Sequence, residues 1–369
     1  MDVWCGERTL LLLVIFDRTP GRLWEQKLFR REAATFRKGP FPESQAALPP
    51  DNNPMKRLLI HPALVFILIL TACATVNPLA QSVSPPAEVD LHRAQGAYAA
   101  GNYTLAIEYL GRAIQAGELG DASLAEAYYD RGVAYSAQGE YERALADYQQ
   151  ALRLKPDFTE ASINLGALYN ALGEYARAVT TFTEIIRSKP DAAEAHYNRG
   201  NAYVALDEFQ QALTDYNRAL QLEPTSAETY YNRGNVYFML GQWQPAIADY
   251  GQAIHLNPRH VMAYNNRGIA YRALEQHRQA IADYDQAIRL APELYGTYNN
   301  RGNAYSALGE WRKAIADYDQ SLRLNPDSAE TYYNRGLAYE ALGQVARAKE
   351  DFKKAADLNQ RQGRIIQGP

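Results

Sequence analysis

Between residues 125 and 362 the pattern of apolar and polar positions repeats every 34 residues. In the stretch 227–258, apolar side chains recur three and four residues apart, which predicts two amphipathic helices, at about 227–240 and 245–256. Small and turn-forming residues recur at the same interval: Gly132, Gly166, Gly200, Gly234, Gly268, Gly302 and Gly336; Ala144, Ala178, Ala212, Ala246, Ala280, Ala314 and Ala348; Pro156, Pro190, Pro224, Pro258, Pro292 and Pro326. The pattern therefore predicts seven helix–turn–helix units, from 125–158 to 329–362, and positions below are counted from the first residue of each unit.

The residues between the helices indicate how each unit turns. Position 15 closes the first helix and is glycine in five units: Gly139, Gly173, Gly241, Gly309 and Gly343. Glycine suits a left-handed helix end, so the two units with Asp207 and Glu275 there are expected to be strained. Capping boxes are predicted at Asp191/Glu194, Thr225/Glu228 and Asp327/Glu330. Large aromatic residues are expected to fill the space between the helices: Tyr135, Tyr169, Tyr203, Tyr237, Tyr271, Tyr305 and Tyr339.

A 34-residue period with these glycine, alanine and proline positions resembles the tetratricopeptide repeat (TPR). The resemblance implies an all-α fold, a right-handed TPR solenoid of about eight helix–turn–helix repeats. Residues 87–124 keep Gly101, Ala106 and Ala113 but carry Ala94 in place of glycine and an insertion near 117–120, so they are predicted to be a degenerate first TPR. Residues 363–369 are a C-terminal tail.

The N-terminal segment looks like a bacterial lipoprotein signal. Met55-Lys56-Arg57 precedes an apolar run from Leu58 to Leu70, and Leu70-Thr71-Ala72-Cys73 has the form of a lipobox. The run is shorter than the about 20 residues that a spanning helix needs. The resemblance implies a signal peptide at 55–72, a lipid on Cys73, and a lipid-anchored linker at 73–86. The alternative is a chance apolar stretch that ends in cysteine.

Two further expectations concern location. Ala74, which is not acidic, follows the cysteine, and by analogy with lipoproteins this favours the outer membrane, facing the periplasm of a bacterial envelope. Residues 1–54 show no repeat and a proline-rich end, so we interpret them as an unstructured upstream extension before a start at Met55.

Composition removes several classes of function. Residues 73–369 hold 28 Lys and Arg against 35 Asp and Glu, so acidic residues are in excess. This argues against a nucleic-acid partner, because proteins that bind nucleic acids present a basic face. The two cysteines, Cys5 and Cys73, cannot form a disulfide framework. Histidines do not follow a metal-ligand spacing, and no phosphate-binding or nucleophile motif is present, so neither a metal, a cofactor nor catalysis is expected.

Arginine at position 7 and aspartate at position 23 occur together. The pairs are Arg131/Asp147, Arg199/Asp215, Arg233/Asp249, Arg267/Asp283, Arg301/Asp317 and Arg335/Asp351. The unit 159–192 has Leu165 and Thr181 instead, so both residues are lost together. This predicts structural ion pairs, either between the two helices of a unit or between neighbouring units. As surface pairs, each is expected to contribute only ~0–1 kcal/mol to stability.

In the TPR architecture the first helix of each unit lines a concave groove, and its position 6 is asparagine in six consecutive units. An amide can both donate to and accept from a peptide bond, so this row could hold an extended backbone, as the asparagine ladder of protein O-GlcNAc transferases does. The alternative is that asparagine is simply common at this position in TPR proteins. The predicted groove residues are Asn164, Asn198, Asn232, Asn266, Asn300 and Asn334, with Asn201, Asn235 and Asn303 at position 9 and Asn265 and Asn299 at position 5.

Two adjacent units differ from the others in this groove. Position 2, mostly glutamate, is Met262 and Gly296, and position 5, mostly tyrosine, is Asn265 and Asn299. The difference marks either a contact site or drift between recently duplicated units.

The sequence as a whole predicts a non-enzymatic, lipid-anchored scaffold that binds extended peptide segments or partner proteins in the groove. The alternative is a dedicated assembly factor, for a pilus secretin or for outer-membrane biogenesis, with one obligate partner. Homo-oligomerisation is left open, and TPR motifs specify a fold rather than a partner.

Overall fold

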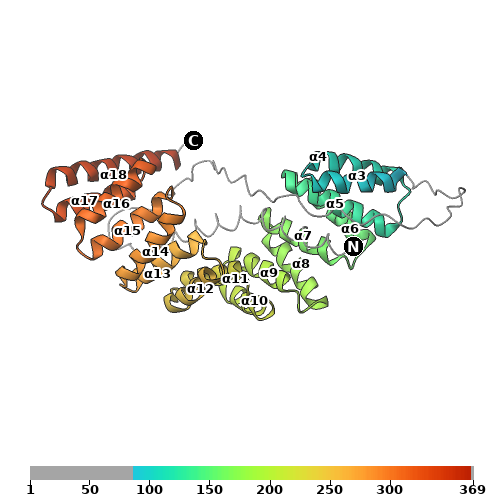
Figure 1. Cartoon of the computed structure of the whole chain (residues 1–369), viewed down its shortest axis with the longest axis horizontal. Coiled ribbons are helices and arrows are strands. Elements are labelled where there is room, and N and C mark those ends of the chain that lie inside the picture. The colour runs from blue at the N-terminus through green and yellow to red at the C-terminus, as the bar shows by residue number, and fades with distance from the viewer. Residues whose placement is uncertain (1–85, 367–369) are drawn as a thin grey trace, which may run out of the picture.

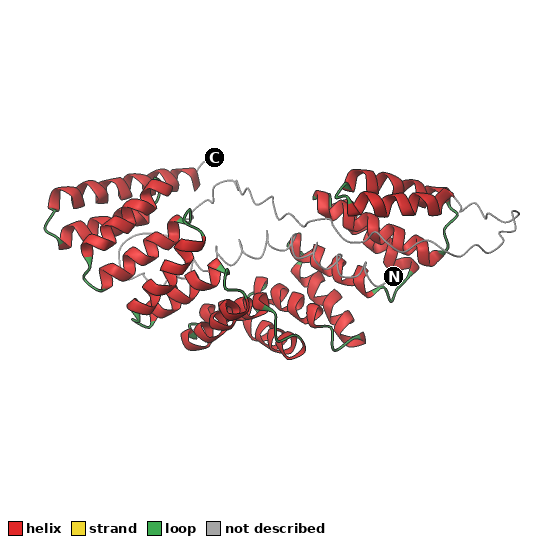
Figure 2. Ribbon diagram, in the orientation of Figure 1, coloured by secondary structure: helices red, strands yellow, loops and turns green. Residues whose placement is uncertain are grey.

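The computed structural model describes residues 86–366, and side chains as far as 361. In this part of the chain every regular element is a helix (Figures 1 and 2). The helices are α3 (Pro86–Ala99), α4 (Tyr103–Ala116), α5 (Asp121–Gln138), α6 (Tyr141–Leu154), α7 (Thr159–Ala171), α8 (Tyr175–Ser188), α9 (Ala193–Ala205), α10 (Phe209–Leu222), α11 (Ala227–Met239), α12 (Trp243–Leu256), α13 (Val261–Ala273), α14 (His277–Leu290), α15 (Tyr295–Ala307), α16 (Trp311–Leu324), α17 (Ala329–Ala341) and α18 (Val345–Ile366). The predicted signal peptide, Cys73 and the extension 1–54 lie outside the described residues.

The sixteen helices of this region form eight pairs that stack along an arch (Figure 1). Each odd-numbered helix packs mainly against the even-numbered helix of its own pair, and that even-numbered helix packs against the first helix of the following pair. From α7 onward, odd-numbered helices of successive pairs also contact one another, while the even-numbered helices contact one another less. The odd-numbered helices therefore form the inner, concave layer, because stacked units lie closer together on the inside of a curve.

Helix boundaries agree closely with the sequence pattern. In the unit that begins at residue 227, α11 ends one residue before the predicted end, and α12 begins at Trp243, two residues before its predicted start. Pro245 therefore occupies the third position of α12, where the missing N–H costs no intrahelical hydrogen bond. The predicted first unit is also present as the pair α3 and α4. The all-α solenoid of eight repeats is confirmed.

The glycine at position 8 of each unit is required because the two helices of a pair pack closely there. A Cβ placed on Gly234 would lie 2.9 Å from the ring of Tyr250, and in the neighbouring units the same clash occurs with the ring at position 24. Tyr216, Tyr250, Tyr284 and Tyr318 are buried to within 1%. The aromatic residues that fill the space between the helices are thus at position 24. The position 11 tyrosines, which we had expected there, are only half-buried in all units but one.

The turns confirm one prediction and correct another. The five predicted glycines have φ between 72° and 78°, and Asp207 and Glu275 adopt the same left-handed conformation, with φ of 61° and 60°. The capping boxes, however, were placed one residue too early. The hydroxyls of Ser226 and Ser328 accept hydrogen bonds from the backbone N–H three residues on, so these serines are the N-caps.

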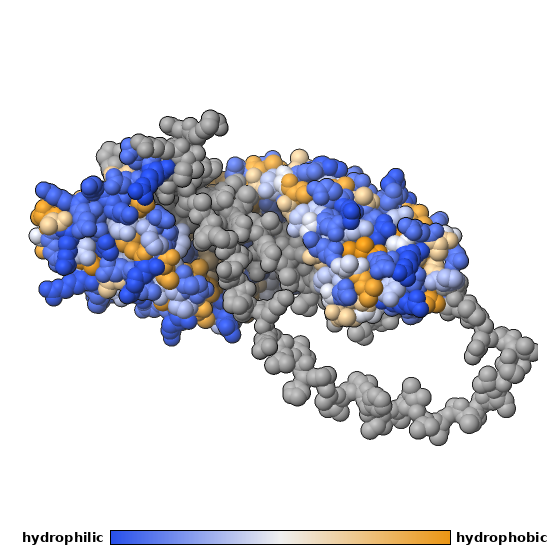
Figure 3. Space-filling model, turned by 90° about the horizontal axis from the view of Figure 1, so that it is seen from above, coloured by the Kyte–Doolittle hydropathy of each residue, from blue (hydrophilic) through white to orange (hydrophobic). Residues whose placement is uncertain are grey.

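Across 86–366 no helix is both long enough and apolar enough to cross a membrane. The face of the molecule seen in Figure 3 is mostly hydrophilic, with small, scattered apolar spots. Single exposed apolar residues are normal on a soluble domain and by themselves indicate no binding site.

Candidate functional site

The concave layer carries a row of carboxylates at position 2 of the odd-numbered helices. Four of them are exposed: Glu126, Glu160, Glu228 and Glu330. Glu194 is half-buried, and burial raises its pKa, with a further contribution from Glu223. On the odd-numbered helices of the described region, the Lys and Arg side chains other than the paired arginines are Arg93 and Arg272.

The asparagines at position 6 connect neighbouring units. Asn266 Nδ2 donates to Tyr231 Oη at 3.2 Å and to Asn235 Oδ1 at 3.1 Å, both in the preceding unit. Asn232 repeats this arrangement one unit earlier, with bonds to the residues at positions 5 and 9 of the unit before it. Four of the six, Asn164, Asn198, Asn232 and Asn266, are at most 4% exposed, whereas Asn300 and Asn334 are half-buried. Five of these amides thus hold one repeat to the preceding one: Asn164, Asn232, Asn266, Asn300 and Asn334.

Asparagine at position 9 links the same network to the core ring of its own unit. Tyr216, Tyr250 and Tyr318 donate from Oη to the Oδ1 of Asn201, Asn235 and Asn303, at 2.7, 2.9 and 2.8 Å. Burial raises the pKa of Tyr250 well above its usual value, so this hydroxyl keeps its proton and remains a donor. The sequence analysis named these asparagines as groove residues but did not predict their bonds to the tyrosines at position 24.

The two exceptional units replace the tyrosine hydroxyl by an amide oxygen. Asn265 Oδ1 accepts from Asn300 Nδ2 at 3.3 Å, and Asn299 Oδ1 accepts from Asn334 Nδ2 at 3.2 Å. The substitution at position 5 therefore preserves the bond between units. It also shortens the side chain, and nothing lies within 4 Å of a Cβ placed on Gly296. The role of these two units as a contact site stays a prediction.

The arginine–aspartate pairs join three helices. Arg233 bonds to Asp249 of the same unit through Nε and Nη2, both at 2.7 Å, and through Nη1 to Asn217 of the preceding unit at 2.6 Å. Tyr230 and Tyr237 flank the guanidinium at 5.5 and 5.9 Å from the ring centroids. The predicted ion pair therefore lies between the two helices of one unit. Arg199, Arg301 and Arg335, like Arg233, add a bond from Nη1 to the preceding unit.

These pairs are more buried than we had expected. The six aspartates are at most 6% exposed, and burial raises the pKa of Asp249 although its two bonds from Arg233 lower it. The expectation that these pairs lie on the surface was therefore wrong, because each aspartate is buried and depends on its arginine for compensation of its charge. How much each pair contributes to stability stays a prediction. Among the residues that the structure describes, no cluster of three or more His, Cys, Asp or Glu side chains could hold a metal ion.

Comparison with known families identifies the repeat. A profile of the tetratricopeptide repeat matches residues 125–158, 227–260, 261–294 and 329–362, and a second TPR profile matches 166–207, 200–241 and 302–343. Together these matches cover more than half of the chain. No curated protein matches the sequence.

Solved structures match over parts of the chain. A tetratricopeptide repeat protein from Parabacteroides merdae is 21% identical, with a TM-score of 0.52, and the match covers 72% of this chain and 99% of that one. A MamA structure (27% identity, TM-score 0.44) covers 45% of this chain and 96% of its own. YrrB, described as a TPR protein with an unusual peptide-binding site, is 24% identical with a TM-score of 0.44, over 48% of this chain and 91% of its own. The repeat matches and the paired-helix arch together show that the chain belongs to the tetratricopeptide-repeat proteins.

Proposed function

We propose that this protein is a scaffold that binds extended segments of partner proteins along the concave face of its repeats, and that a lipid on Cys73 attaches it to the periplasmic face of a bacterial outer membrane. The observation that carries the binding role is the inner layer of odd-numbered helices, which contact one another from α7 onward, with exposed carboxylates at position 2 of four units. Proteins built from TPR units generally act as non-enzymatic interaction scaffolds, which supports the same role.

The asparagine series has a smaller part in this proposal than the sequence suggested. The amide nitrogens of Asn164, Asn232 and Asn266 already bond to neighbouring repeats, so removal of these side chains would disturb the array as well as the groove. Binding of a peptide backbone by the asparagines stays a prediction, with Asn300 and Asn334 the better candidates because they are only half-buried. The exposed glutamates test the groove more cleanly.

The test is partner capture from detergent-solubilised bacterial envelopes with groove and outer variants. Glu160→Gln with Glu228→Gln removes two exposed carboxylates from inner helices, and Glu142→Gln with Glu184→Gln makes the same exchange on outer helices. We expect the inner pair to weaken capture roughly tenfold and the outer pair to leave it unchanged. Loss of capture with the outer pair alone would place the binding surface on the even-numbered helices and contradict the proposal.

The same purification separates the two kinds of scaffold. Several substoichiometric partners indicate an adaptor, whereas one stoichiometric partner indicates a dedicated assembly factor.

Membrane attachment is tested independently. We expect Cys73→Ser to move the protein from the membrane fraction to the soluble periplasmic fraction. Sedimentation of the Cys73→Ser protein with membranes, or detection of peptides from before Cys73 in the mature protein, would contradict lipidation.

A further inference from the structure

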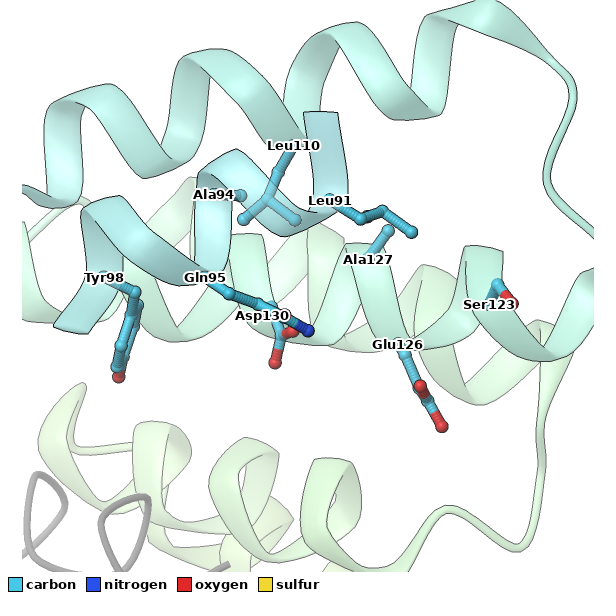
Figure 4. Close-up of a pocket in the computed structure, with 9 residues that line it drawn as sticks. All are labelled: Leu91, Ala94, Gln95, Tyr98, Leu110, Ser123, Glu126, Ala127 and Asp130. Carbon is cyan, nitrogen blue, oxygen red and sulfur yellow. The ribbon is translucent and has the colours of Figure 1, made fainter. Parts of the chain in front are cut away.

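The first repeat borders a cavity. It lies between α3, α4 and α5 and has a volume of about 70 Å³, whereas one water molecule needs only ~10–15 Å³. Leu91, Ala94, Leu110 and Ala127 form its apolar wall, and the polar side chains around them include Tyr98, Glu126 and Asp130 (Figure 4).

Comparison between units explains why the cavity exists. Position 24 is Tyr or Phe in the seven later units, and its ring covers the glycine at position 8. In the first unit these positions are Leu110 and Ala94, and the methyl group of Ala94 occupies the place that a ring would need. Position 5, which in four of the later units supplies a tyrosine packed against that ring with centroids 5.5–6.1 Å apart, is Leu91. The ring found at position 24 of every later unit is thus replaced by a shorter side chain, and the space that it would fill stays open.

Charge and shape at the mouth of the cavity point to one kind of ligand. In Figure 4 the Tyr98, Glu126 and Asp130 side chains extend in the same direction, away from the apolar wall formed by α3 and α4. Asp130 takes the place of the asparagine found in the six later units, so the first junction between repeats carries a negative charge where the others carry a neutral amide. An apolar recess bordered by two carboxylates and an aromatic ring suits an alkyl stem that ends in a cation, which gains from apolar contact, charge pairing and the face of the ring.

We propose that this cavity takes the side chain of a lysine in the extended segment that binds along the groove. Because the cavity is at the first of the eight units, the lysine would set the register of the segment at one end of the array. The inference rests on the proposed binding function and specifies the ligand chemistry of its first unit.

The experiment compares blocked, fluorescently labelled peptides that are identical in an uncharged, randomised sequence except for a central lysine or norleucine. Norleucine keeps the alkyl stem and removes the charge. Fluorescence anisotropy with the chain from residue 73 onward should show roughly tenfold tighter binding of the lysine peptides, with the preference weakened by added salt. Equal binding of the two sets would overturn the lysine proposal and leave groove binding intact, whereas failure of both sets to bind would overturn both proposals.

Two variants change the cavity toward the later repeats. Asp130→Asn removes the charge but keeps the shape, and Ala94→Gly with Leu110→Tyr fills the cavity in the way that the other units do. We expect each to abolish the preference for lysine, while Glu142→Gln, which neutralises an exposed carboxylate on the outer helix α6, should keep it. Retention of the preference in folded Asp130→Asn protein, with a thermal midpoint near that of the unmodified chain, would overturn the assignment even if the filled variant fails to fold.

Discussion

Among single residues, the arginine at position 7 has the largest structural consequence. Arg233 satisfies a buried carboxylate in its own unit and an amide in the preceding one, and only 19% of its side chain is exposed. Loss of one partner from a buried ion pair typically costs about 3–5 kcal/mol, because the other charge stays buried and unpaired. We therefore expect Arg233→Leu to lower the free energy of unfolding by about this amount at pH 7, measured by denaturant melts.

The loss of stability in Arg233→Leu should depend on pH in a defined direction. Removal of Arg233 removes the two interactions that lower the pKa of Asp249, so burial raises that pKa further. As pH falls, the folded variant then binds a proton before the unfolded chain does, because an unfolded aspartate has a pKa of about 3.9. The deficit relative to the unmodified protein should shrink as pH falls from 7 toward 5.

The chain supplies the control for this prediction. The unit 159–192 has Leu165 and Thr181 at the corresponding positions. Arg233→Leu combined with Asp249→Thr copies that solution and should recover most of the stability. A single variant as stable as the unmodified protein would show that the buried aspartate needs no counter-charge.

The buried asparagines make a second prediction at this scale. Asn266→Ala removes the donor that now serves both the Tyr231 hydroxyl and the Asn235 carboxamide oxygen, and the latter keeps only its bond from Tyr250. An unsatisfied buried polar group costs about 1–3 kcal/mol, so thermal melts should show a clear loss. Asn300→Ala, at a half-buried site with one such bond to Asn265, should cost less. If neither variant lowered the thermal midpoint, the result would contradict a structural role for the asparagines at position 6.

At the scale of the element, the turns between paired helices differ in strain. Glu275 holds a φ of 60° where Gly241 holds 72° in the preceding unit. A left-handed conformation costs a residue with a Cβ roughly 1–2 kcal/mol. Glu275→Gly should therefore raise the thermal midpoint, and the reciprocal change Gly241→Glu should lower it. A lower thermal midpoint for Glu275→Gly would contradict this prediction and would mean that the Glu275 side chain contributes more to stability than the strain costs.

At the scale of the molecule, each unit contacts mainly its neighbours, so stability should vary along the array. A unit inside the arch is held from both sides, whereas α3–α4 and α17–α18 are held from one. Hydrogen–deuterium exchange read by mass spectrometry should show faster exchange in these end pairs than in α9–α12. Uniform protection along the arch would instead indicate a single cooperative unit.

The sequence by itself determined the repeat length, the eight helix pairs and, in the unit that begins at residue 227, the helix boundaries to within about two residues. It could do so because the period, the left-handed turn residues and the close approach at Gly234 are local requirements that recur seven times. The joint loss of arginine and aspartate in one unit even identified a contact between residues sixteen positions apart. The family resemblance added the curved, stacked arrangement.

Only the tertiary structure decided how polar groups are shared between these elements. Burial depends on what the neighbouring unit places above a side chain, so the pattern could not show that Asp249 is 4% exposed or that Asn266 bonds back to Tyr231. For the same reason, Leu110 looked like an ordinary apolar residue in the sequence. Its consequence appears once stacking sets it against Ala94 and Asp130 and leaves between them the space that a ring fills in every later repeat.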